Sequence, residues 1–218
     1  MIKECSQDIG KLTAFSIFSG AGGMDIGVMQ AGFEILACIE LDHNCCDTLR
    51  ENIKRENRET KVYEGDIRTF SPKSIMNDLS IKEGHIDLLF GGPPCQAFSQ
   101  IGKQLSLQDD RGMLLYQVLR YAEALKPHAI MMEQVKGLLT AKDLNGNPGG
   151  VFNSFIEKLE ALGYVPKWKV MLAAEYGVPQ LRERVILVGN QMVLYFLALR
   201  MLLRRDAVGC SLCCHTLQ

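Results

Sequence analysis

One cysteine of the sequence stands among residues that a protein core does not usually hold. Pro93 and Pro94 come directly before Cys95, and a polar segment, Gln96-Ala-Phe-Ser99, follows it. Because proline fixes the backbone φ angle, the two prolines would present the thiol in one orientation. A lone cysteine is more often packed in a core than reactive. The stiff, polar surroundings favour the other interpretation, in which Cys95 is a nucleophile at the end of a strand.

Two later segments carry charged side chains that could act on the same substrate. Glu133 ends an otherwise apolar run, where burial would raise the pKa of its carboxyl group and let it act as an acid. Arg182 and Arg184 alternate, so in an extended chain both would point to one side and could clamp a carboxylate, a phosphate or the edge of a base. An ordinary surface carboxylate at Glu133, and a solvated charge cluster around Glu183, are the alternatives.

A glycine cluster, Gly20-Ala21-Gly22-Gly23, follows the β-rich run that ends at Phe18. Glycine lets a chain turn sharply and approach a ligand closely, because no Cβ stands in the way. A dinucleotide fingerprint, Gly-x-Gly-x-x-Gly, would need its third glycine where Asp25 stands. The cluster therefore indicates a ligand-binding turn and disfavours NAD or FAD.

Two acidic residues extend this ligand site. Glu40 comes about twenty positions after the glycine cluster, at the end of the second predicted strand, where an acid suits the two hydroxyls of a ribose. Asp66 ends the third predicted strand and could accept a hydrogen bond from the exocyclic amine of adenine. Glycine turns and single acids are common, so each feature is weak alone. Together they describe a nucleoside-shaped ligand.

Short apolar runs alternate with longer mixed segments over residues 1–190. The runs predict strands at 13–18, 34–39, 61–63, 86–90, 128–132, 164–173 and 185–188. Apolar residues at helical spacing predict helices at 23–31, after Asp42, at 113–125 and at 152–162. This alternation is typical of a doubly wound, mostly parallel α/β sheet, which binds ligands at the carboxyl ends of its strands. We therefore predict one catalytic domain over residues 1–190, with its site at that edge.

The overall composition is that of a chain that buries a core. Hydrophobic residues make up 47% and charged residues 22% of the 218 residues, and the formal net charge is −1. Proteins that bind duplex nucleic acid usually present a basic surface, so any such surface must be local here. The N-terminus has no apolar segment of signal-peptide length, and the apolar stretch 192–203 is interrupted by Arg200 and too short to span a bilayer. We expect a cytoplasmic protein without a membrane partner.

The tail, residues 191–218, differs from the rest. It is apolar without a clean helical stripe, and we interpret it as an atypical, out-of-frame or non-native end. Cys210, Cys213, Cys214 and His215 leave open a zinc-binding tail. Their crowding, with no second ligand pair nearby, favours no metal.

Seven short motifs in one order identify a family. FSGAGG, IELD, GDI, GGPPCQAFS, RGMLL, MEQV and QLRER resemble the motifs of the cytosine-C5 methyltransferases. The resemblance covers about the first 190 residues, and the Pro-Pro-Cys-Gln motif together with the others makes it specific. It implies a Rossmann-like fold that binds S-adenosyl-L-methionine.

The resemblance assigns the residues of the cofactor site. It implies that Phe18 stacks on the adenine, that Gly20, Ala21, Gly22 and Gly23 cradle the methionine part, and that Glu40 holds the ribose. Asp66 and Ile67 would contact adenine, Pro93 would line the pocket, and Leu41 completes the set.

The resemblance also implies a mechanism on duplex DNA. The target cytosine must leave the base stack, because Cys95 cannot reach C6 of the ring within a duplex. Addition of the thiolate to C6 makes C5 nucleophilic, while Glu133 takes up the developing charge at N3. Arg182 and Arg184 would surround the flipped base. Methyl transfer to C5 and loss of the C5 proton would then release Cys95.

The sequence departs from the family pattern at two places. Gln134 follows Glu133 where the family has asparagine, and its longer side chain would shift the loop that holds Glu133. After Asn190 nothing resembles the target-recognition region or the final motif of the family, so we expect a chain without the second lobe. An inactive fragment, a subunit completed by a second chain that supplies target recognition, and a tRNA cytosine-C5 methyltransferase therefore stay open.

Overall fold

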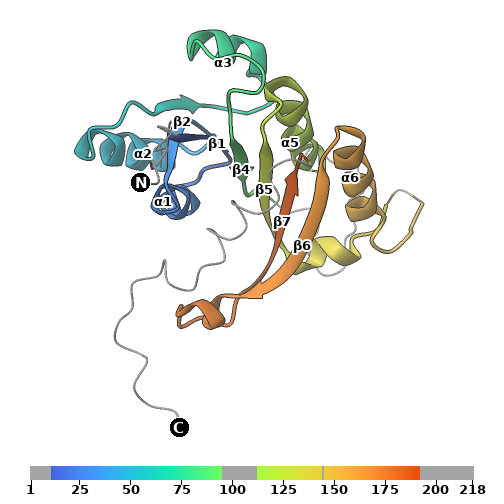
Figure 1. Ribbon diagram of the computed structural model, residues 1–218. Coiled ribbons are helices and arrows are strands. Elements are labelled where there is room, and N and C mark those ends of the chain that lie inside the picture. Colours follow the sequence, from blue (N-terminus) through green and yellow to red (C-terminus); the bar gives the residue numbers. More distant parts are fainter. Residues whose placement is uncertain (1–10, 95–111, 144, 192–218) are drawn as a thin grey trace, which may run out of the picture.

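The computed structural model describes residues 11–94, 112–143 and 145–191 (Figure 1). Cys95, most of the motif around it and the tail after Gln191 lie outside these ranges. Within them, no helix is both long and apolar enough to cross a bilayer.

The described residues form one seven-stranded sheet in the order β3-β2-β1-β4-β5-β7-β6 (Figure 1). The strands are β1 (Leu12–Ile17), β2 (Phe33–Glu40), β3 (Lys61–Glu64), β4 (Leu88–Gly91), β5 (Ala129–Val135), β6 (Val165–Leu172) and β7 (Glu183–Asn190). The first five strands pair in parallel, whereas β7 runs antiparallel to both β5 and β6. The predicted doubly wound, mostly parallel sheet is confirmed.

Helices cover both faces of this sheet. They are α1 (Gly23–Gln30), α2 (His43–Arg55), α3 (Pro72–Asp78), α5 (Gly112–Leu125) and α6 (Gly150–Ala161), with the short 3-10 helices η1 (Lys136–Thr140) and η2 (Ala173–Tyr176). Buried side chains of α1 and α2 join one hydrophobic cluster, and those of α3, α5 and α6 join the other. The layers are therefore helix, sheet, helix.

Alternate residues of the central strands enter the two clusters. Leu89, Ile130 and Met132 pack on the side of α5 and α6, while Leu88 and Met131 pack on the side of α1 and α2. Strands buried on both faces need apolar side chains at every position, which explains their continuous hydrophobic runs.

The centre of the sheet is tight where β1 meets β4. A Cβ added at Gly91 would lie 2.0 Å from the carbonyl oxygen of Ile17, so only glycine fits at the end of β4. On one side of this point β1 is followed by β2 and β3, and on the other side β4 is followed by β5, β7 and β6. Doubly wound folds bind their ligands at the point where the strand order reverses in this way.

Candidate active site

A cavity of about 640 Å³ opens at the carboxyl ends of β1, β2, β3 and β4. It contains six of the ten predicted cofactor residues: Phe18, Gly20, Glu40, Leu41, Asp66 and Ile67. The remaining wall is formed by Ile39, Asp42, His43, Gly65, Arg68, Gly92, Pro94 and Leu114. Residues far apart in the sequence thus meet at the edge where the sequence predicted the site.

The glycine cluster forms a tight loop between β1 and α1. Gly20 and Gly22 have φ angles of 55° and 88°, in the left-handed region that favours glycine. A Cβ at Gly22 would lie 2.9 Å from Cδ2 of Leu49, so this position also needs glycine for space. Ala21 and Gly22 lie behind the main cavity, in a crevice of about 50 Å³.

Hydrogen bonds between buried polar side chains stabilise this loop. The Ser19 hydroxyl donates to Oγ of Ser16 over 2.7 Å, and the Cys38 thiol donates to Oδ1 of Asp25 over 3.2 Å. Burial raises the pKa of the Asp25 carboxyl group and also that of the Cys38 thiol. Asp25, which argued against a dinucleotide fingerprint, is 3% exposed and part of this support.

Glu40 joins the glycine loop to the end of β2. Its Oε2 accepts from the backbone N–H of Gly20 at 2.7 Å, and its Oε1 accepts from Leu41 and Asp42 at 2.8 and 2.9 Å. The carboxylate is therefore fixed at the cavity wall, and of its roughly four lone-pair sites about one, on Oε2, is left for a ligand donor.

Two arginines that the sequence did not single out hold the loop after β3. The backbone N–H and the guanidinium of Arg68 donate to the Asp66 carboxylate, the shortest contact being 2.6 Å from Nη2 to Oδ2. Arg120 of α5 donates from Nη2 to the carbonyl oxygen of Ile67 over 2.5 Å. The hydrogen bonds from Arg68 lower the pKa of Asp66, so this carboxyl group stays ionised.

Glu133 and Arg184 meet across the antiparallel pair β5 and β7. Arg184 Nε lies 2.6 Å from Oε1 of Glu133, and the two side chains are 23% and 27% exposed. The carboxylate is thus neither fully buried nor unpaired. A Cβ at Gly92 would lie 3.2 Å from Oε2 of Glu133, which places Glu133 beside the chain that leads to Cys95.

Gln134 contacts that same chain from the other face of β5. Its side chain is 3% exposed, and its Nε2 donates to the carbonyl oxygen of Pro93 over 2.5 Å. Pro93 itself is buried and is not part of the cavity wall, which Gly92 and Pro94 form. The residue noted as a departure from the family pattern therefore anchors the Pro-Pro segment.

Arg182 does not join the Glu133 pair within the described part of the chain. It is exposed and lies just before β7, where its carbonyl oxygen accepts from the N–H of Ala173 at 2.9 Å. Lys136 instead contacts Glu183, with Nζ 2.9 Å from Oε2. Of the two predicted arginines, the structure brings only Arg184 to Glu133, and the role of Arg182 stays a prediction.

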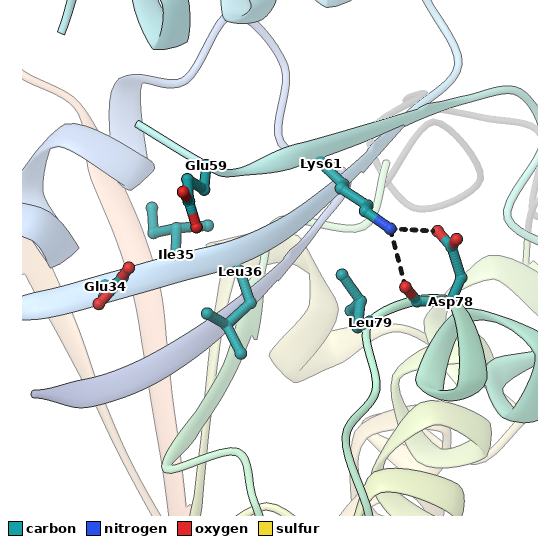
Figure 2. Close-up of a pocket in the computed structure, with 7 residues that line it drawn as sticks. All are labelled: Glu34, Ile35, Leu36, Glu59, Lys61, Asp78 and Leu79. Carbon is teal, nitrogen blue, oxygen red and sulfur yellow. Dashed lines mark hydrogen bonds and ion pairs between the residues drawn. The ribbon is translucent and has the colours of Figure 1, made fainter. Parts of the chain in front are cut away.

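A second hollow, of about 220 Å³, lies away from this edge (Figure 2). It is formed by the beginnings of β2 and β3 and the end of α3. Lys61 reaches across it, with Nζ 3.1 Å from Oδ2 of Asp78 and 2.8 Å from the carbonyl oxygen of the same residue. The apolar side chains of Leu36 and Leu79 also line this hollow. No predicted site residue lies here.

Comparison with known proteins agrees with the motif order. The family model described as C-5 cytosine-specific DNA methylase matches residues 12–196. The chain belongs to this family. The match contains every strand and helix named above together with the motif around Cys95.

Individual members of the C-5 cytosine-specific DNA methylase family are similar over most of this chain. Type II methyltransferase M.AquIA of Picosynechococcus sp. is 40% identical over 185 residues, which are 81% of this chain and 71% of that protein. Type II methyltransferase M.NgoMIV of Neisseria gonorrhoeae is 41% identical over 179 residues, 82% of this chain and 52% of that protein.

Solved structures of methyltransferases share the fold. A protein described as a DNA modification methyltransferase encoded within a prophage of E. coli has a TM-score of 0.68 and 25% identity, over 83% of this chain and 47% of its own. DNMT2 of Spodoptera frugiperda has a TM-score of 0.62 and 25% identity, over 84% of this chain and 51% of its own. The chain thus spans about half of these two structures, and the Rossmann-like fold is confirmed.

Proposed function

We propose that this protein takes part in transfer of a methyl group from S-adenosyl-L-methionine to C5 of cytosine in DNA. The observation that carries the proposal is one edge of the sheet. There the cavity with Glu40 and Asp66 lies next to the Glu133–Arg184 pair and the Pro-Pro segment that leads to Cys95. Membership in the methylase family supports this combination.

The cavity fits S-adenosyl-L-methionine in its chemistry. Glu40 and Asp66 are acceptors for ribose hydroxyls and for an adenine amine, and the apolar side chains of Phe18 and Ile67 suit an adenine ring. The positive-φ glycine loop leaves room that side chains would fill. When bound, the cofactor supplies an electrophilic methyl group on a sulfonium.

We assign the remaining steps to the chain's own residues. The Cys95 thiolate adds to C6 of cytosine, and Glu133, which must be protonated at this step, supplies a proton at N3 as the ring takes up the electron pair. C5 then attacks the methyl carbon as the bond from that carbon to the donor sulfur breaks, so that S-adenosylhomocysteine is the leaving group. Loss of the C5 proton to a base expels Cys95 as its thiolate, and the proton at N3 returns to Glu133, which restores the ring. Arg184 orients Glu133, because their ion pair fixes the carboxylate beside Gly92.

We further propose that target recognition is supplied outside the described residues, by further sequence or by a second chain. Val178 and Leu181 are 48% and 88% exposed and come shortly before Arg182 in the chain. Exposed apolar side chains next to a catalytic centre suit a surface that another lobe covers. The DNA would be a duplex with its target cytosine flipped out.

The test is methyl transfer from labelled S-adenosyl-L-methionine to unmethylated genomic DNA, with tRNA as the competing substrate. We expect label at cytosine C5 of DNA and none with Cys95→Ala, which removes the nucleophile. Should the chain alone bind cofactor but transfer nothing, adding the product of a neighbouring reading frame tests the two-chain form. Label in tRNA and none in DNA would contradict the assignment of substrate.

A further inference from the structure

Two residues of the cofactor cavity, Asp66 and Arg68, form an ion pair within the loop after β3. Arg68 Nε lies 3.0 and 2.9 Å from the two oxygens of Asp66, and its Nη2 lies 2.6 Å from Oδ2. The backbone N–H of Arg68 also donates to Oδ1, at 2.9 Å. Both residues line the cavity; the side chain of Arg68 is 43% exposed and that of Asp66 is 27% exposed.

These contacts decide which ligand groups Asp66 can accept. An ionised carboxylate offers about four lone-pair sites and donates nothing. The three N–H groups of Arg68 occupy about three of them, since Nε is shared between the two oxygens. One site is left for a donor from the ligand. The planar guanidinium also fixes the orientation of the carboxylate, as bidentate arginine pairs do.

The backbone of the same loop is held independently. Arg120, from α5, donates to the carbonyl oxygen of Ile67, the residue between Asp66 and Arg68. Because this second contact does not involve Arg68, replacing Arg68 should leave the backbone at Ile67 in place while it releases the Asp66 carboxylate. The role of Arg68 can therefore be separated from that of the fold.

We propose that Arg68 is a positioning residue for Asp66. By orienting the Asp66 carboxylate with one acceptor site left open, Arg68 makes the cavity select a 6-amino purine over a 6-oxo purine. The inference rests on the proposed function, in which an adenine-containing cofactor occupies this cavity. A 6-amino group donates to the carboxylate, whereas a 6-oxo group would place an acceptor against an acceptor. Without Arg68, the Asp66 carboxylate can rotate, so its free acceptor site is no longer fixed toward the ligand.

The experiment compares two ligands by calorimetry, S-adenosylhomocysteine and its 6-oxo analogue S-inosylhomocysteine. The full chain is used as wild type, Arg68→Met, Arg68→Lys and Arg50→Met. Arg50 is the matched control, because its side chain is also 43% exposed and pairs with an acid, Glu64, over 2.7 Å. Thermal melting of each variant checks that it is folded.

For the wild type and Arg50→Met we expect the adenosyl ligand to bind more than tenfold more tightly than the inosyl ligand, as for sites built to receive a donor. Arg68→Met should weaken adenosyl binding about tenfold and inosyl binding much less, because only the former uses the oriented acceptor. Arg68→Lys keeps the charge but loses the planar guanidinium, so its adenosyl affinity should lie between those of the wild type and Arg68→Met. In Arg68→Met the loss of adenosyl affinity on acidification should begin at a higher pH than in the wild type.

Two results would overturn the inference while leaving the proposed function intact. One is equal weakening of both ligands by Arg68→Met, which indicates a general disturbance of the cavity. The other is unchanged affinity and selectivity in every Arg68 variant. Failure of the folded wild type to bind S-adenosylhomocysteine would instead overturn the proposed function and this inference together.

Discussion

Substitution of Gly22 by alanine should destabilise the protein more than the same change at either neighbouring glycine. Gly22 has a φ of 88°, and a Cβ there would lie 2.9 Å from Cδ2 of Leu49, whose side chain is 4% exposed. The left-handed conformation costs about 1–2 kcal/mol for a residue with a Cβ. Crowding a packed leucine adds about 1–3 kcal/mol. We expect Gly22→Ala to lower the free energy of unfolding by about 2–5 kcal/mol.

Two glycines of the same loop separate these contributions. Gly20 has a φ of 55° and nothing within 4 Å of an added Cβ, so Gly20→Ala should cost only the conformational part, about 1–2 kcal/mol. Gly23, the first residue of α1, has neither a positive φ nor a close neighbour. Gly23→Ala should therefore be neutral or stabilise by up to about 1 kcal/mol.

The assay is urea unfolding followed by circular dichroism, which gives the free energy of unfolding of the wild type and the three variants. The predicted order of stability is Gly23→Ala, Gly20→Ala, Gly22→Ala, from most to least stable. Equal losses at Gly22 and Gly23 would refute the reasoning, because they would mean that neither the φ angle nor the contact with Leu49 determines the cost.

Further predictions concern buried hydroxyls, acid stability and the Pro-Pro segment. Among the described residues, the buried hydroxyl of Tyr121 has no hydrogen-bond partner, so Tyr121→Phe should leave stability unchanged or raise it by about 1 kcal/mol. Tyr164→Phe loses a 2.7 Å hydrogen bond to a backbone carbonyl and should lower stability by about 1–2 kcal/mol in the same urea assay. The pKa of Asp66 is lower in the folded protein than in an unfolded chain, so its stabilisation is present above about pH 4 and is lost as the pH falls through the folded value. Melting curves between about pH 6 and 2 should therefore fall less steeply for Arg68→Met than for the wild type, and parallel curves would contradict this. Gln134→Leu removes the hydrogen bond to the Pro-Pro segment. It should slow methyl transfer and leave the affinity for S-adenosylhomocysteine unchanged. An equal loss of transfer rate and affinity would contradict a role confined to that segment.

The fold could be predicted from the sequence because its signals are local. Short apolar runs predicted the strands, and a helix was predicted after Asp42, whose carboxylate accepts from the N–H of Cys45 at 2.9 Å. Leu49 and Ile53, four residues apart on that helix, are both buried. Helix α3 was missed, since Pro72, Ile75 and Met76 are its only buried residues and seven residues show no helical period.

The candidate site was predictable in its residues but not in its contacts. Glu40 and Asp66 were identified because each ends a strand, and the parallel sheet brings such ends together. The meeting of Glu133 with Arg184 depends on the antiparallel register of β5 and β7, which no local pattern contains. Arg68 and Arg120 were overlooked because a single arginine on a surface or a helix is common, and only tertiary structure shows which groups they hold. The roles assigned to the site residues stay predictions.

Calorimetric titration of the chain with S-adenosylhomocysteine tests the central claim most directly. The control is Glu59→Gln, at the second hollow away from the proposed site, and the test variant is Glu40→Gln. We predict saturable binding of one ligand per chain by the wild type and Glu59→Gln, and affinity at least about tenfold weaker for Glu40→Gln. Absence of saturable binding by a folded wild type, or equal affinity in all three proteins, would contradict a cofactor site at this edge of the sheet.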